Sequence, residues 1–348
     1  MTIVVRPVDL DSEQQELVSV LQRNLPNLPH ARRFEWLYRQ NPHGPAWSWF
    51  ACDQQADKVV GIASVFPRAM WVGGEVVLCG QVGDFAIDSS YRSLGPAVLL
   101  QRATFEPVNC GNLAFCYDCP PHEAGMSTFR RLGIQANCQM YRYARLLRAD
   151  RKVQKFLGRG PWIGPVGTVA NLLLRLQTRR RQSVPGLEIT LHSGRFGEEF
   201  SLLDEQLARK EVIRARRQAP DLNWRYREDP LHEYQILTAR HGRELVAFVV
   251  VWVAGQDASV VDFFGLRFPG VAVALLEAAV QHCRRASVQT VEAFLSDDHE
   301  FSAALKEAHF RCRSAAARVV AYARPGSEMS VLLEKRSRWS LNQVEILA

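Results

Sequence analysis

The sequence has little that indicates a metal site. Its eight cysteines are scattered along 348 residues, and only Cys116 and Cys119 have the close spacing that metal sites use. No second pair completes a tetrahedral set of ligands, so we predict that no metal is bound. Buried free thiols in a reducing compartment are the simpler interpretation, and they favour a cytoplasmic protein.

Long apolar segments are also scarce. Residues 160–174 carry no charge, but they are too few and too often interrupted by glycine and proline to span a membrane. Residues 1–7 form too short an apolar run for a secretory signal, and we expect them to form a first strand. The chain is nevertheless 47% hydrophobic, so it can build sizeable cores, and its length suits two domains.

Positive charge is concentrated in one segment. The net charge is +7, yet residues 142–181 contain eleven Lys or Arg and one acid, so they carry +10 and the rest of the chain carries −3. A nucleic-acid-binding protein usually carries such charge on a folded face with stacking aromatics, so we expect no DNA partner. We interpret residues 146–185 as a basic linker.

The linker has a composition that suits a membrane surface. Within residues 162–181, Trp162, Leu173 and Leu176 would face lipid, and the arginines at 179–181 would meet anionic headgroups. We therefore predict a peripheral membrane contact through this segment. A solvated connector that docks on its own domains stays an alternative.

The sequence repeats itself. Residues 34–42 and 222–230 share Trp, Tyr, Arg and Pro in register, at an offset of 188 residues. Further matches follow in order at a slowly shrinking offset: 58–62 with 244–248, 84–85 with 262–263, and 112–117 with 290–295. Ordered matches of this kind indicate a duplicated unit of alternating strands and helices. We predict an α/β protein with domains at 1–145 and 186–348, each a mixed sheet flanked by helices.

The aromatic residues of the repeat have helical spacing. Trp36 and Tyr38 correspond to Trp224 and Tyr226. We expect each pair to pack its own helix against its own sheet. Stacking on a sugar or peptide acceptor stays an alternative, because an aromatic face suits such ligands.

Residues 83–103 carry the most informative pattern. A short apolar strand ends at Asp88, a polar turn follows, and an apolar-periodic helix begins near Gly95. Such a turn directs backbone N–H groups and the positive end of the helix dipole at one point, which suits a pyrophosphate. Gly95 has no Cβ, so a ligand can approach the backbone closely. An ordinary strand-to-helix connection without a ligand stays an alternative.

The strand 86–88 followed by Arg92-x-x-Gly95-x-Ala97 resembles the signature of the GNAT superfamily of acyl-CoA-dependent N-acyltransferases, and the duplication resembles its tandem arrangement. The resemblance implies acetyl-CoA or another acyl-CoA as co-substrate. It implies that the diphosphate is held by Arg92, Ser93, Leu94, Gly95, Pro96 and Ala97, and that the pantetheine arm pairs with Phe85, Ala86 and Ile87. Pro96 departs from the ideal donor set, because proline has no N–H.

The resemblance also implies a carboxylate general base, for which Asp84 and Asp118 are the candidates. Many GNAT relatives use a tyrosine general acid, but Phe129 stands at the matching position here. We take Tyr117 as the candidate acid, with His122 as a further substitute.

The glycine motif returns in the second copy as Arg267-Phe-Pro-Gly270, after a shorter turn from Asp262. The shorter turn would misdirect the loop. We therefore expect the first copy to hold the acyl-CoA and the second to be structural or to shape the acceptor cleft.

The resemblance implies an acyltransferase, in the first place an N-acetyltransferase, that acts on the amine or hydroxyl of a small-molecule or glycan acceptor. An amino sugar or a surface-glycan precursor would fit, and the enzyme would work in the cytoplasm or at the inner face of the membrane. Two alternatives stay open. One is a Fem-like transferase that takes aminoacyl-tRNA, with the linker gripping RNA, and the other is a non-catalytic module that binds a glycan or a partner protein.

Overall fold

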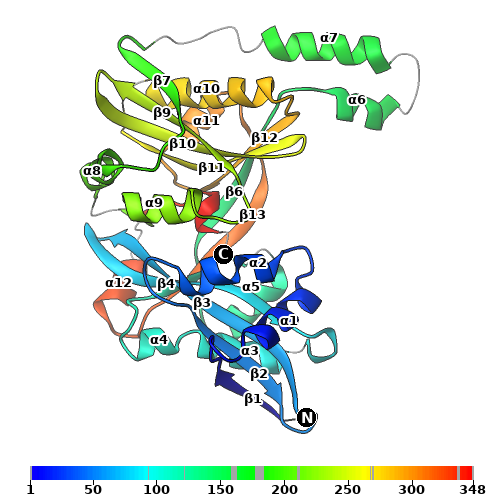
Figure 1. Cartoon of the computed structure of the whole chain (residues 1–348), viewed down its shortest axis with the longest axis vertical. Coiled ribbons are helices and arrows are strands. Elements are labelled where there is room, and N and C mark those ends of the chain that lie inside the picture. The colour runs from blue at the N-terminus through cyan, green and yellow to red at the C-terminus, as the bar shows by residue number, and fades with distance from the viewer. Residues whose placement is uncertain are drawn as a thin grey trace.

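The strands of the protein join into one large mixed sheet that runs through both copies (Figure 1). This computed structural model describes residues 2–92, 94–120, 122–157, 163–176, 184–209, 212–266, 268, 270–334 and 338–346. The described strands form a 14-stranded sheet with the path β1-β2-β3-β4-β5-β13-β6-β12-β11-β10-β9-β7, and β8 and β14 pair beside it. The predicted α/β class is confirmed.

The first copy contains six strands and the helices that cover them. Its elements are β1 (Ile3–Pro7), α1 (Gln14–Asn24), α2 (His30–Phe34), a π-helical turn (Glu35–Arg39), β2 (Trp47–Asp53), β3 (Lys58–Val72), β4 (Glu75–Ile87), α3 (Leu94–Ala103), α4 (Glu106–Asn109), β5 (Cys116–Asp118), α5 (Glu123–Arg131) and β6 (Ala136–Leu146). Two helices follow, α6 (Asp150–Leu157) and α7 (Ile163–Leu176).

The second copy repeats this plan. Its elements are β7 (Leu187–His192), α8 (Glu198–Gln206), β8 (Val212–Ala215), α9 (Ala219–Tyr226), β9 (Tyr234–His241), β10 (Glu244–Ala254), β11 (Asp257–Gly265), α10 (Val271–Arg285), β12 (Thr290–Ser296), α11 (Ser302–Glu307), β13 (Arg311–Tyr322), α12 (Glu328–Glu334), β14 (Arg338–Trp339) and a 3₁₀ turn (Gln343–Glu345). The buried face of α10 repeats at helical spacing from Val271 to Cys283.

The two copies exchange a strand. β6 of the first copy pairs antiparallel with β12 of the second, from Leu146 opposite Thr290 to Met140 opposite Ser296. β13 of the second copy lies between β6 and β5 of the first. The repeated units are therefore joined through their hydrogen-bond ladders as well as through packing. The boundaries 1–145, 146–185 and 186–348 stay a prediction.

The repeated tryptophans pack on each other. The rings of Trp36 and Trp224 stack with centroids 4.8 Å apart, and each indole N–H donates to the other residue's carbonyl, at 2.9 and 3.2 Å. The expectation that each tryptophan packs on its own sheet is therefore wrong for Trp224, which lies in the core of the first copy, whereas Trp36 packs against the core of its own copy. Tyr38 and Tyr226 do pack in the cores of their own copies.

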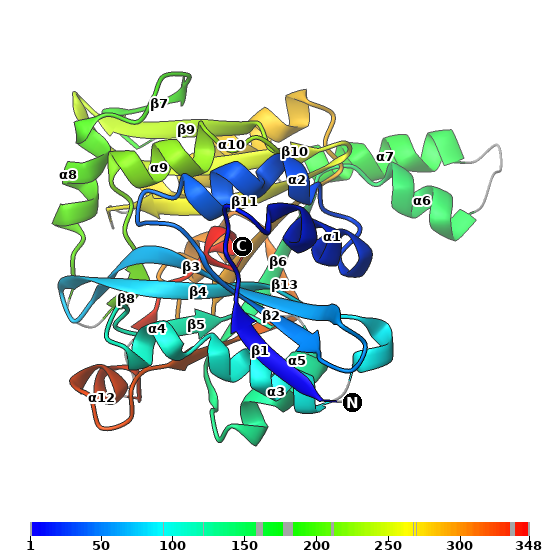
Figure 2. The ribbon, with the colours of Figure 1, turned by 60° about the horizontal axis from the view of Figure 1, so that its bottom comes forward.

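Helices α6 and α7 stand away from the body of the sheet in both views (Figure 1 and Figure 2). The side chain of Asn171 in α7 joins that helix to the start of α6. It accepts a hydrogen bond from the Ala149 N–H at 2.7 Å and donates one to Asp150 at 2.9 Å. Among the described helices none is long and apolar enough to cross a bilayer. Trp162 and the arginines at 179–181, which the sequence placed at a membrane, lie outside the described residues.

Candidate active site

The sheet opens between β4 and β5. In the described part of the chain, these strands pair only through Gly80 with Cys116 and Gln81 with Tyr117, whereas β4 pairs with β3 as far as Ile87. The edge of β4 from Val82 to Ile87 that faces away from β3 is thus left without a strand partner. An open strand edge offers N–H and C=O groups to an extended ligand.

Phe85, Ala86 and Ile87 all lie on this open stretch of β4. Ala86 and Ile87 are buried and Phe85 is half-buried, so their side chains pack while one edge of their backbone stays unpaired by any described strand. The structure thus places the three residues predicted for the pantetheine arm on one edge.

A bulge interrupts β4 at Asp84. The register with β3 shifts between Ile62 and Ser64, and Asp84 adopts a φ of +47°, which is uncommon for a residue with a side chain. Its buried carboxylate accepts a hydrogen bond from the Tyr38 hydroxyl at 2.6 Å and forms an ion pair with Arg33. Burial, together with this nearby carboxylate, raises the pKa of Tyr38.

The second copy repeats this arrangement. Asp262 accepts from the Tyr226 hydroxyl at 2.9 Å and from Arg217 at 2.9 Å. Because Asp–Arg–Tyr contacts recur in both copies, they favour a structural role for Asp84, as an anchor for the preceding helix. Its role as general base stays a prediction.

Asp118 has a different environment. It ends β5 at the mouth of the opening, and no ion pair to it forms among the described residues. Desolvation by the surrounding protein raises the pKa of Asp118 to about 7. A carboxylate with a pKa near neutrality can accept a proton at physiological pH, which is what a general base requires.

Tyr117 lies on the opposite face of β5, because successive strand residues alternate. Its fully buried hydroxyl receives a hydrogen bond from Arg68 at 3.0 Å and donates to the Glu345 carbonyl at 3.2 Å. Burial raises the pKa of Tyr117. Its role as general acid stays a prediction.

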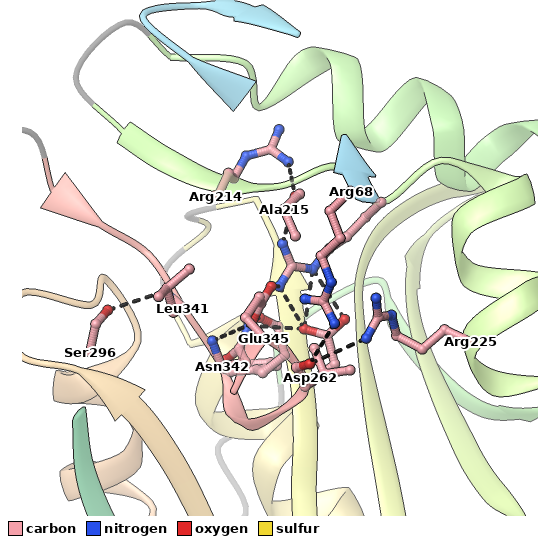
Figure 3. Close-up of polar contacts among 12 residues, drawn as sticks. Arg68, Arg214, Ala215, Arg225, Asp262, Ser296, Leu341, Asn342 and Glu345 are labelled. Atoms are coloured by element: carbon pink, nitrogen blue, oxygen red, sulfur yellow. Dashed lines mark hydrogen bonds and ion pairs between the residues drawn. The ribbon is translucent and has the colours of Figure 1, made fainter. Parts of the chain in front are cut away.

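Beyond Tyr117 lies a charged cluster between the two copies, which Figure 3 shows. Arg217 bridges Asp262 and Glu345, the latter at 2.6 Å, and Arg68 and Arg225 both donate to the Val344 carbonyl at 3.2 Å. Burial raises the pKa of Glu345 against the lowering effect of Arg217. Sequence reasoning missed these residues, because charges far apart in the chain leave no local pattern.

The turn from β4 into α3 is fixed by Asp88. Its buried carboxylate accepts from Arg23 at 2.8 Å and Asn24 at 2.7 Å, and pairs with Lys58 at 3.0 Å. Burial alone would raise the pKa of Asp88, but these donors outweigh it and lower the pKa. The turn is therefore anchored by side chains from outside it as well as by its own backbone, in which the Tyr91 N–H donates to the Asp88 carbonyl at 2.8 Å.

The predicted diphosphate loop begins α3. Leu94, Gly95, Pro96 and Ala97 form its first turn, where the N–H groups have no partner within the helix, so Pro96 costs no helical hydrogen bond. A Cβ at Gly95 would meet no atom within 4 Å, so the space above it is open. Arg92 Nε donates to the Ile87 carbonyl at 3.1 Å. Ser93 and the side chain of Leu94 lie outside the described residues.

The corresponding opening in the second copy is filled by the chain itself. β11 pairs with β12 from Asp257 to Val260, and beyond that point Leu295 of β12 bridges to Asn342, whose side-chain amide donates to the Phe263 carbonyl at 3.3 Å. The backbone carbonyl of Phe263, the counterpart of Phe85, is thus already hydrogen-bonded within the chain. Gly270 is left-handed, with φ +77°, and Arg267 lies outside the described residues.

No family model matches the chain, and neither does any curated protein sequence. Solved structures do match. A probable N-acyltransferase from Enterococcus faecalis V583 superposes with a TM-score of 0.67 at 13% identity, covering 93% of this chain and 72% of that one. A GCN5-related N-acetyltransferase from Anabaena variabilis gives 0.64 at 13% identity, with 92% and 72% covered.

A third match is the N-myristoyltransferase of Saccharomyces cerevisiae with bound myristoyl-CoA and inhibitors. It gives a TM-score of 0.58 at 12% identity, covering 92% of this chain and 80% of that one. The protein therefore has the GNAT fold, and its internal repeat presents that fold twice. The fold expected from the strand–turn–helix motif is confirmed.

Proposed function

We propose that this protein is an acyl-CoA-dependent acyltransferase whose first copy binds the acyl-CoA. The observation that carries the proposal is the open edge of β4 from Val82 to Ile87, which leads directly to the unobstructed first turn of α3. The comparisons support it, since the matching structures are described as acetyltransferases or acyltransferases and one holds myristoyl-CoA.

Each part of the co-substrate has a candidate partner. The amide groups of the pantetheine arm would pair with the backbone of Phe85, Ala86 and Ile87, as an added strand does. The diphosphate would lie over Gly95, where the helix dipole and free N–H groups favour an anion. Arg92, at the same turn, has the guanidinium fork that suits a phosphate.

Transfer requires that a neutral amine or hydroxyl attack the thioester carbonyl. Asp118 is the base that the structure supports best, because its raised pKa lets it take the proton of the attacking group near neutral pH. The thiolate of CoA leaves and needs a proton, for which Tyr117 stays the candidate donor. The Tyr117 hydroxyl lies on the other face of β5 from Asp118 and donates to the Glu345 carbonyl, so it would have to leave that contact before it could give its proton to the thiolate.

An amino sugar or surface-glycan precursor as acceptor, acetyl as the acyl group, and a cytoplasmic location remain part of the proposal. Among the residues that the structure describes, no specific contact favours the aminoacyl-tRNA or non-catalytic alternatives.

The test is thermal stabilisation by acetyl-CoA, because a ligand that binds only the folded state raises the melting temperature. Gly95→Leu fits the open space and should fold, yet its side chain would occupy the diphosphate position. Gly197→Leu is the matched control, since Gly197 also starts a helix, has a φ of −98° and has no atom within 4 Å of an added Cβ.

We expect acetyl-CoA to stabilise the wild type and Gly197→Leu but not Gly95→Leu. If acetyl-CoA leaves the wild type unchanged, or stabilises Gly95→Leu equally, the proposed site is wrong. Stabilisation of the wild type by tRNA in place of acetyl-CoA would favour the Fem-like alternative.

A further inference from the structure

A basic hollow lies at the far end of the second copy, beside α7. It measures about 310 Å³, and its lining includes Arg145, Arg284, His309, Arg311, Arg313 and Leu174. In the part of the chain that the structure describes, no aspartate or glutamate lines it. Four arginines from β6, β13 and α10, together with His309, thus converge from distant parts of the sequence, and the potential inside favours an anion.

Arg145 supplies the hollow with a buried hydrogen-bond donor. Its side chain is 4% exposed and pairs with Glu277 at 2.5 Å through Nη1. The other guanidinium nitrogen, Nη2, is buried without a hydrogen-bond partner in the structure as described. A buried charged donor without a partner is costly, so its presence in a basic hollow points to a ligand that completes it.

The helix beside the hollow has an outward apolar face. Val166, Val169 and Leu172 recur every three residues along α7 and are 42%, 58% and 56% exposed. The opposite face turns inward, because Asn171 bonds to Asp150 and the Leu174 carbonyl accepts from Arg284 at 3.3 Å. The inward side is therefore tied to the start of α6 by Asn171 and to α10 by the Arg284 contact, whereas the outward face has no cover within the described chain.

The contact from Arg284 to the Leu174 carbonyl places the hollow at the C-terminal end of α7, where it adjoins the helix that carries the apolar face. We call the hollow and this apolar face together the α7 surface. Figure 1 shows α7 standing beside the second copy, at the end away from β1. Apolar side chains next to clustered arginines are the combination that binds an interfacial helix to a negatively charged bilayer.

We propose that the α7 surface docks on an anionic membrane, with a lipid phosphate in the arginine hollow and Val166, Val169 and Leu172 among the acyl chains. This inference does not depend on acyl transfer, and its test uses no CoA.

The experiment is co-sedimentation of the full chain with vesicles of phosphatidylcholine alone, or with phosphatidylglycerol added. Arg311→Gln with Arg313→Gln removes two exposed charges from the hollow, and Val169→Ser with Leu172→Ser removes the apolar face. The matched controls are Arg243→Gln with Arg324→Gln, and Val76→Ser with Leu202→Ser, which change exposed residues elsewhere.

We expect binding to the anionic vesicles alone, weakening as salt rises. The hollow variant should lose roughly tenfold or more in affinity, because each basic residue near such a surface contributes about 1 kcal/mol. The apolar variant should lose several-fold, and both controls should bind like the wild type. Circular dichroism confirms that every variant is folded.

Equal binding to both vesicle types, no binding to either, or unchanged binding by the hollow variant would overturn the proposal. A separate measurement with inorganic phosphate distinguishes a lipid phosphate from a soluble one. If it raises the melting temperature of the wild type but not of the hollow variant, and vesicles do not bind, the hollow is a site for a soluble phosphate and the membrane proposal is wrong.

Discussion

The two copies of the fold keep the same buried contact and differ at the strand edge next to it. In each copy, a buried aspartate accepts a hydrogen bond from a tyrosine hydroxyl of an earlier helix. The aspartate is Asp84 of β4 with Tyr38 in the first copy, and Asp262 of β11 with Tyr226 in the second. In the first copy the following strand edge is open, whereas in the second it meets Asn342. The comparison indicates that duplication preserved the contacts that fold each copy while the sites diverged.

The ends of the corresponding strands show the same divergence. Asp118 ends β5 and has a pKa raised to about 7 by desolvation. Its counterpart Ser296 ends β12, and its hydroxyl accepts a hydrogen bond from the Leu341 N–H at 3.1 Å and donates to the Trp339 carbonyl. The first copy thus keeps a carboxylate with no ion-pair partner in the described chain, and the second has a hydroxyl fully used by its own chain.

The largest expected effect comes from breaking the buried aspartate contacts of the two copies. Arg217 forms ion pairs with two buried carboxylates, Asp262 and Glu345, whereas Arg33 forms its buried ion pair with Asp84. Arg217→Met should lower the free energy of unfolding by about 3–5 kcal/mol, because it leaves buried charge uncompensated. Arg33→Met should cost less. Urea denaturation measures the free energy of unfolding of both variants. An equal loss in the two would show that the ion pair with Glu345 adds no stability to the second copy.

The next effect is on catalysis. If Asp118 is the base, kcat/KM should rise with pH and level off above about pH 7, since the ionised form accepts the proton. Asp118→Asn should lower kcat about 100-fold or more and abolish that rise. Ser296→Ala, at the counterpart, should leave the pH profile unchanged. A profile that persists in Asp118→Asn would return the role to Asp84.

The same carboxyl group should make stability depend on pH. Its folded pKa lies above the unfolded value of about 3.9, so the folded state binds more protons between these values, and stability falls as pH rises from about 4 to about 7. Asp118→Asn should therefore be more stable than the wild type at pH 8, by on the order of 4 kcal/mol, and not at pH 4. A difference that does not change between the two pH values would contradict the raised pKa.

The smallest effect concerns the rings where the copies meet. Trp36 and Trp224 stack and exchange two hydrogen bonds. A double-mutant cycle of Trp36→Leu and Trp224→Leu should give a coupling of about 0.5–1.5 kcal/mol in the free energy of unfolding. Strictly additive losses would show that each ring packs on its own copy, as the sequence had suggested.

Much of the fold followed from local patterns. The apolar strand before Asp88, the turn at Arg92 and the periodic helix after Gly95 indicated both the GNAT fold and the place of the open edge. The repeat at Trp36 and Trp224 indicated two copies. It misled about the rings themselves, because a repeated residue marks an equivalent position in each copy and does not say whether the copies touch there.

The sequence by itself determined the repeating α/β units, because apolar periodicity and turn residues act over a few neighbouring positions. Only the tertiary structure decided the exchange of β6 and β13, the filling of the second opening by residues 341–342, and the convergence of Arg68, Arg217 and Glu345. These features join residues that lie far apart along the chain. Their energies arise from burial and charge pairing, which exist only once the copies have packed.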